Sequence, residues 1–128
     1  MNFQARVFAT SSAPEFQTAE RCHIRELSNS TDDERVSIAR ARVEPGVTTA
    51  LHRLRGIEER YLILEGAGRV EVGGPDLAAE VSPGDVVWIP PGVTQRITNT
   101  GTIDLVFLCI CTPRFDRRCY ELMEAGPA

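Results

Sequence analysis

Short apolar runs alternate with turn-forming residues along most of this chain. From Pro45 onward, signals that contain Gly, Pro, Asn or Asp recur every eight to twelve residues, and the segments between them are rich in Val, Ile, Leu, Tyr and Thr. This rhythm is typical of an antiparallel sandwich or barrel, and no stretch has the strand–helix alternation of a parallel α/β fold. The pattern predicts an all-β domain with strands near residues 22–27, 35–43, 50–54, 59–64, 69–72, 77–81, 86–89, 94–98 and 103–111.

The N-terminal segment departs from this rhythm. In residues 1–20, the apolar side chains of Phe3, Ala5 and Val7 alternate with polar ones before a turn-rich stretch. We therefore expect a loosely attached N-terminal arm that is either an edge strand or disordered. Residues 21–112 contain the regular strand signals and are expected to form the barrel.

The C-terminal tail, residues 113–128, has a different period. Phe115, Cys119 and Leu122 recur at positions i, i+4 and i+7, which is the spacing of one face of an α-helix. Asp116 lies where its carboxylate can accept a hydrogen bond from a free backbone N–H of the first turn. The tail is therefore predicted to form a short helix, capped by Asp116, that packs against the barrel.

Two of the predicted strands are apolar on both faces. The segments 61–64 and 103–111 carry hydrophobic residues at successive positions rather than only at alternate ones. Strands of this kind are covered on both sides. One side faces the opposing sheet, and we expect a second copy of the chain to cover the other side in a homodimer.

The composition is that of one globular domain. Of the 128 residues, 42% are hydrophobic and 25% are charged. No apolar run approaches the ~18 residues that span a bilayer, so no membrane insertion is expected. Residues 1–16 lack the continuous apolar segment of a secretory signal, so a cytoplasmic location is expected.

The charged residues exclude two further classes of function. All 14 basic residues are arginine, so lysine Schiff-base and P-loop chemistry are excluded. The arginines are spread along the chain between 18 acidic residues, and the net charge is −4. Nucleic acids are bound through clustered positive charge, which this pattern lacks. We therefore expect no nucleic-acid partner.

The four cysteines do not form a recognisable framework. Cys22, Cys109, Cys111 and Cys119 are irregularly spaced, and a chain of this length can build a core without disulfides. Cys109 and Cys111 lie on one face of a predicted strand. We expect these thiols to pack as small hydrophobic side chains, and a metal or redox role for them is the alternative.

Two glycine-bounded segments carry the candidate chemistry. In the first, Gly46 is followed after five residues by His52, and Glu59 and Gly66 follow later. Strand alternation brings Glu59 and Tyr61 to one face, which we interpret as the interior. An imidazole and a carboxylate are good ligands for a divalent metal, and a carboxylate is also a candidate general acid or base.

The second segment has its own regular spacing. Gly84 is followed after five residues by Pro90, then by Gly92, Gln95 and Asn99. Proline followed by glycine is typical of tight turns between strands. Together, the two segments resemble the two conserved motifs of the cupin superfamily, in particular its small single-domain bacterial members. The resemblance implies a double-stranded β-helix, a jelly-roll β-barrel, over about residues 21–112.

The resemblance also implies a metal site, which this chain keeps only in part. Metal-binding cupins hold Fe, Mn, Ni or Zn with three imidazoles and a carboxylate. At those positions, this chain has His52 and Glu59, with Leu54 and Gln95 in place of the other two histidines. The expected metal ligands are therefore His52, Glu59 and Gln95, in a loosely binding site. His23, the remaining histidine, is expected to face outward.

Two functions follow from the resemblance. The first is a small-molecule-binding cupin with a degenerate divalent-metal site, which catalyses oxygenation, isomerisation or lyase chemistry on a small oxygen-rich metabolite. Glu59 and Tyr61 are then the catalytic candidates. The alternative is a cupin that binds or senses a metabolite without a metal and without catalysis.

Overall fold

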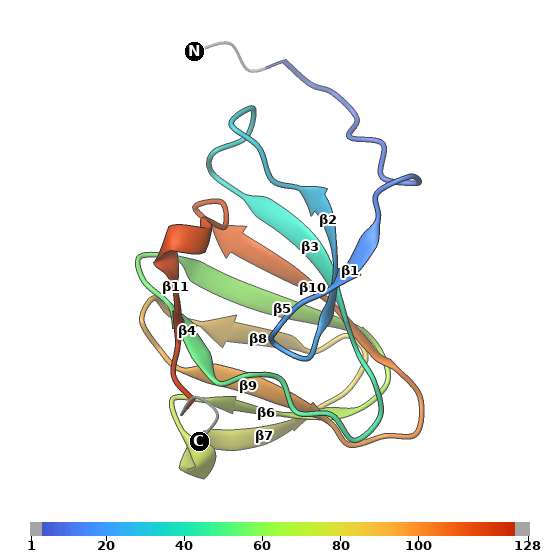
Figure 1. Cartoon of the computed structure of the whole chain (residues 1–128), viewed down its shortest axis with the longest axis vertical. Helices are drawn as coiled ribbons and strands as arrows, with labels where there is room; N and C mark the ends of the chain where they lie inside the picture. Colours follow the sequence, from blue (N-terminus) through green and yellow to red (C-terminus); the bar gives the residue numbers. More distant parts are fainter. Residues whose placement is uncertain (1–3, 125–128) are drawn as a thin grey trace.

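The computed structural model describes residues 4–124, which form two antiparallel sheets (Figure 1). One sheet has six strands in the order β1-β2-β3-β10-β5-β8, and the other has five in the order β11-β4-β9-β6-β7. The strands are β1 (Glu15–Gln17), β2 (His23–Ser28), β3 (Ser37–Val43), β4 (His52–Leu54), β5 (Glu58–Glu65), β6 (Gly68–Val72), β7 (Ala78–Val81), β8 (Val86–Ile89), β9 (Gln95–Asn99), β10 (Leu105–Thr112) and β11 (Tyr120–Leu122).

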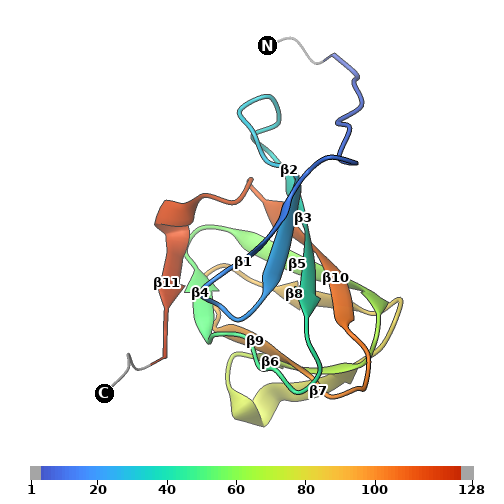
Figure 2. The same ribbon diagram turned by 45° about the vertical axis from the view of Figure 1, so that its right-hand side comes forward.

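The two sheets face each other, as the turned view in Figure 2 shows, and the main hydrophobic core lies between them. The architecture is a double-stranded β-helix, as expected. Alternation along each strand puts every second side chain inside. In β5, Glu59, Tyr61 and Ile63 are buried, whereas their neighbours are half-buried or exposed. Ile89 and Ile97 complete the centre of the core.

Tight turns between the strands depend on glycine at specific positions. Gly66, between β5 and β6, has φ +86°, and a Cβ atom there would lie 2.7 Å from the carbonyl oxygen of Asp104. Only glycine combines this left-handed conformation with such a close approach of backbone. The turn fixes the register of β5, the strand that carries two of the predicted site residues.

Each of the predicted strands has an observed counterpart, with ends that differ by a few residues. The N-terminal arm contributes β1, which pairs with β2 at the edge of the larger sheet. Within residues 4–124, no helix is long and apolar enough to cross a membrane.

The predicted short helix in the tail is wrong. Residues 117–119 form a single 3₁₀ turn, and the chain then extends into β11, which pairs with β4. Asp116 does cap this turn, because its side chain accepts a hydrogen bond from the backbone N–H of Arg118. Pairing with the free edge of β4 outweighs the weak helical periodicity, and Leu122 is exposed instead of packed on a helix face.

Candidate functional site

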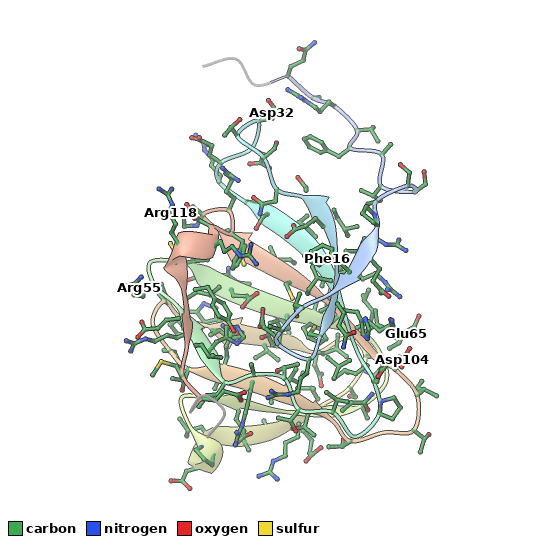
Figure 3. All side chains as sticks on the ribbon, in the orientation of Figure 1. Phe16, Asp32, Arg55, Glu65, Asp104 and Arg118 are labelled. Atoms are coloured by element: carbon green, nitrogen blue, oxygen red, sulfur yellow. The ribbon has the colours of Figure 1, made fainter. Side chains whose placement is uncertain are left out.

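A cavity of about 520 Å³ lies in the barrel, a volume typical of small-molecule sites. His52 on β4 and Glu59 and Tyr61 on β5 line it from the two sheets. Phe16 of the arm, labelled in Figure 3, and Tyr120 of the tail also belong to the lining. The cavity is therefore bounded by both sheets and by both terminal segments.

Glu59 is buried in the cavity wall. On β5 it lies opposite Cys111 of β10 on one side and Ile89 of β8 on the other, and it is 6% exposed. Its Oε2 accepts a weak hydrogen bond from the Cys111 thiol at 3.5 Å, and its Oε1 has no partner among the described residues. Burial raises the pKa of Glu59. The cavity therefore contains a buried acid with one unused hydrogen-bonding position.

His52 reaches the cavity from the opposite sheet with its tautomer set by the backbone. Its Nδ1 donates to the carbonyl oxygen of Ala50 at 2.8 Å, and Glu20 Oε2 lies 3.5 Å from the same nitrogen. The Tyr120 ring stacks on the imidazole with 4.9 Å between ring centroids. Because Nδ1 carries the proton in the neutral ring, Nε2 keeps a lone pair that can accept a hydrogen bond from a ligand.

Gln95 supports the cavity wall from behind. It is fully buried on β9, opposite His52 in register, and its side chain is not part of the lining. The Tyr61 hydroxyl donates to Gln95 Oε1, which joins the two sheets through one hydrogen bond. Gln95 Nε2 has no partner among the described residues. Burial raises the pKa of Tyr61 well above its usual value, so the phenol stays protonated.

Three cysteines, which we call the cavity thiols, also line the cavity: Cys22, Cys109 and Cys111. All four cysteines of the chain are free. Burial raises the pKa of Cys22 to about 12 and raises those of Cys109 and Cys111 as well. The thiolate is the reactive form of cysteine, so these groups are inert near neutral pH and behave as small apolar side chains.

The structure brings most of the predicted site residues together. His52, Glu59 and Tyr61 share the cavity, and Gln95 lies behind Tyr61. His23 is not part of the lining, and its Nε2 lies 3.5 Å from a glutamate oxygen elsewhere on the surface.

Sequence reasoning missed two residues that complete the cavity, Glu20 and Tyr120. Both lie in segments treated as an arm and a tail, outside the barrel. The tail did carry a usable signal, because Tyr120-Glu121-Leu122 alternates as a strand does. No comparable signal marked Glu20, because its position depends on how the loop before β2 folds over the barrel.

A family model described as a cupin domain matches residues 39–111, more than half of the chain. The chain is a cupin. It is 36% identical over 88 residues to an uncharacterized protein of Methanocaldococcus jannaschii, covering 69% of each chain. It is also 38% identical over 72 residues to the oxalate-binding protein of Thermotoga maritima, covering 56% of this chain and 58% of that one.

Solved structures share the cupin architecture. The crystal structure of a predicted oxalate decarboxylase from Thermotoga maritima is 26% identical, with a TM-score of 0.73 over 84% of this chain and 99% of that chain. Oxalate decarboxylase from Bacillus subtilis is 18% identical, with a TM-score of 0.79 over 96% of this chain and 33% of that chain. The second similarity concerns the fold alone.

The donor set of this cupin does not fit a divalent metal as it is arranged. Among residues 4–124, no group of three or more His, Cys, Asp or Glu side chains is placed to hold a metal ion. Gln95 Oε1 accepts a hydrogen bond from the Tyr61 hydroxyl, and the amide nitrogen left over has no lone pair for a cation. His52 and Glu59 are then two ligands where a catalytic zinc site has three protein ligands. Metal binding by His52, Glu59 and Gln95 stays a prediction.

Proposed function

We propose that this cupin binds a small polar metabolite in its cavity and that binding does not require a metal. The observation that carries the proposal is the Oε1 atom of Glu59, which is buried at the cavity and has no hydrogen-bond partner within residues 4–124. Leaving a buried polar group unpaired costs about 1–3 kcal/mol. A ligand that pairs with this atom recovers that free energy on binding.

The names of the relatives support a small-molecule ligand. One relative is called an oxalate-binding protein, and one structurally similar protein is described as a predicted oxalate decarboxylase. Oxalate therefore belongs among the first compounds to test. Fold does not determine the ligand, however, and the cavity residues of this chain decide which compound binds.

In this proposal, the cavity residues have different roles in ligand binding. Glu59 forms the central polar contact, and His52 Nε2 accepts a hydrogen bond from a ligand hydroxyl or amine. Tyr61 and Gln95 hold the wall in shape through their hydrogen bond between the sheets. Tyr120 restrains the His52 ring by stacking on it.

A thermal-shift screen tests the proposal. Chelator-treated protein is heated with single metabolites from a panel of dicarboxylates, sugars, polyols and amines, and hits are measured by isothermal titration. We expect at least one compound to raise Tm in wild type, and to do so much less in Glu59→Gln and His52→Ala. The control is Glu65→Gln, because Glu65 is exposed at the end of β5 beside Asp104 (Figure 3). A panel without a hit, or hits unaffected by both cavity variants, contradicts the proposal.

The metal-dependent function predicted from the motifs is tested by the same screen. If a divalent metal completes the site, adding Mn, Fe, Ni or Zn to chelated protein creates hits that metal-free protein lacks, and His52→Ala removes them. Catalysis by Glu59 and Tyr61, in oxygenation, isomerisation or lyase chemistry, then becomes measurable as turnover of the hit compound. Without such hits, the metal-free function is the one that stands.

We also propose that the cupin forms a homodimer through the outer face of β5 and β8. On this face Val86 is 61% exposed, Trp88 57% and Leu64 42%. Neighbouring exposed apolar side chains of this size are typical of protein–protein interfaces. Trp88→Glu is expected to give a monomer in light scattering, and a wild-type monomer contradicts the proposal.

A cytoplasmic location stays a prediction from the sequence.

A further inference from the structure

The ionisable residues around the cavity are mostly acidic. Glu20, Glu26 and Glu59 line it, and the basic lining residues are His52 and Arg117. Glu26 and Arg117 are both exposed, so Glu20, Glu59 and His52 are the less exposed ionisable groups among these five. Among the described residues, the one ion pair of these three glutamates is that of Glu20 with His52, at 3.5 Å. The deepest carboxyl, that of Glu59, has no basic partner within ion-pair distance in residues 4–124 and keeps one oxygen unpaired.

This lack of arginine partners contrasts with the outer surface of the same protein. There, Glu15 pairs with Arg42 at 2.7 Å, and Glu121 pairs with Arg53 at 3.0 Å. The chain has 14 arginines, and several of them pair with surface acids. Within residues 4–124, no arginine forms an ion pair with Glu59, and the basic group that acts on this carboxyl is His52. Because a buried carboxylate without a cation is costly, the missing positive charge points to the ligand.

The apolar part of the lining also suits a cation. Five aromatic side chains contribute to it: Phe16, Tyr61, Phe107, Phe115 and Tyr120. The faces of aromatic rings attract cations through their quadrupole, by about 0.5–2 kcal/mol each. Carboxylates combined with aromatic rings therefore favour a positively charged group on an apolar body.

We propose that the ligand of this cavity is a small organic cation, a protonated amine carried on a compact apolar group. Its N–H groups donate to Glu59 Oε1, and its apolar part lies against the aromatic lining. The inference rests on the proposed function and narrows the ligand class within it. A dicarboxylate such as oxalate would instead add two negative charges beside the carboxyls of Glu20 and Glu59, with His52 and the exposed Arg117 as the basic groups of the lining.

Three probes of the same shape and different charge test the inference. Benzylamine, benzyl alcohol and benzoate are titrated near neutral pH into chelator-treated wild type, Glu59→Gln and the control Glu65→Gln. In wild type and in the control we expect benzylamine to bind about tenfold more tightly than benzyl alcohol, and benzoate to bind more weakly than both. In Glu59→Gln, we expect the ratio of the affinity for benzylamine to the affinity for benzyl alcohol to fall close to one. Glu20→Gln is a second variant, expected to lower the preference in part, in case Glu59→Gln does not fold.

The other outcomes each overturn the inference. Binding of benzoate or oxalate more tightly than benzylamine reverses the predicted charge preference. Equal affinity for the amine and the alcohol, an amine preference that survives in both cavity variants, or no binding of any probe also rejects an organic cation. The proposed function survives these results if a neutral or anionic compound from the broader panel binds in a Glu59-dependent way, and it fails if no compound of any class binds.

Discussion

Replacing Glu59 with glutamine isolates the charge of the cavity carboxyl, because the amide has nearly the same shape. Burial raises the pKa of Glu59 above the ordinary value of 4.5. The folded state therefore binds this proton more tightly than the unfolded chain, so stability is lost as the pH rises through the folded-state pKa and is kept below about 4.5. Glu59→Gln removes this loss and is expected to stabilise the unliganded protein at neutral and alkaline pH.

The contacts of the carboxyl give the size of the effect. The Cys111 thiol at 3.5 Å is a weak donor, and Oε1 has no partner with hydrogen-bond geometry among residues 4–124. The nearby His52 and the Gln95 side chain also lower the pKa of Glu59, but burial outweighs both and the net pKa is raised. An unpaired buried polar group costs about 1–3 kcal/mol. The amide introduced at position 59 also needs hydrogen-bond partners. We therefore expect a stabilisation at the lower end of this range, about 1 kcal/mol, which corresponds to a rise in Tm of ~4 °C for a domain of this size.

Calorimetry tests this prediction. Tm is measured from about pH 4 to about pH 8 for wild type, Glu59→Gln and Glu65→Gln. The difference between Glu59→Gln and wild type is expected to be small at the acidic end and to widen as the pH rises. The Glu65→Gln control, at an exposed position of the same strand, stays near wild type throughout. If Glu59→Gln is less stable than wild type at every pH, Glu59 is stabilised by a partner within the protein and the argument for a ligand fails.

Three further predictions concern the fold around the site. Tyr61→Phe leaves Gln95 Oε1 without its hydrogen-bond donor. We expect the free energy of unfolding, measured in urea, to fall by about 1–3 kcal/mol. An unchanged value would mean that this hydrogen bond contributes little to stability. Gly66→Ala should destabilise more than Gly46→Ala, because both have positive φ but only Gly66 has backbone atoms in the way, and equal losses would contradict this. At about pH 8, the buried thiols of Cys22 and Cys111 are expected to react with iodoacetamide far more slowly than the half-buried Cys119, and mass spectrometry of the labelled peptides checks the order.

The barrel was predictable because its signals are local and repeated. In β5, the alternation of Glu59, Tyr61 and Ile63 with less buried neighbours identifies both the strand and its inner face. The turns on either side carry glycine where positive φ is required, as at Gly66. Period-two patterning and turn chemistry agree with each other along the chain, so each strand is indicated more than once.

The tail and the cavity wall depend on contacts that a local pattern does not contain. Phe115, Cys119 and Leu122 have helical spacing, but the free edge of β4 was available for pairing and made residues 120–122 a strand. The hydrogen-bond partner of Gln95 also could not be predicted from the sequence. The motif spacing indicates an inward position, whereas the use of its oxygen is decided by Tyr61 on the opposite sheet.

The most direct test of the central claim is isothermal titration of the strongest hit compound into chelator-treated protein, in parallel with Glu59→Gln. We predict that metal-free wild type binds one molecule per chain and that Glu59→Gln binds it at least about tenfold more weakly. Binding that disappears on chelation and returns with a divalent metal, or that persists unchanged in Glu59→Gln, contradicts a metal-independent site centred on this carboxyl.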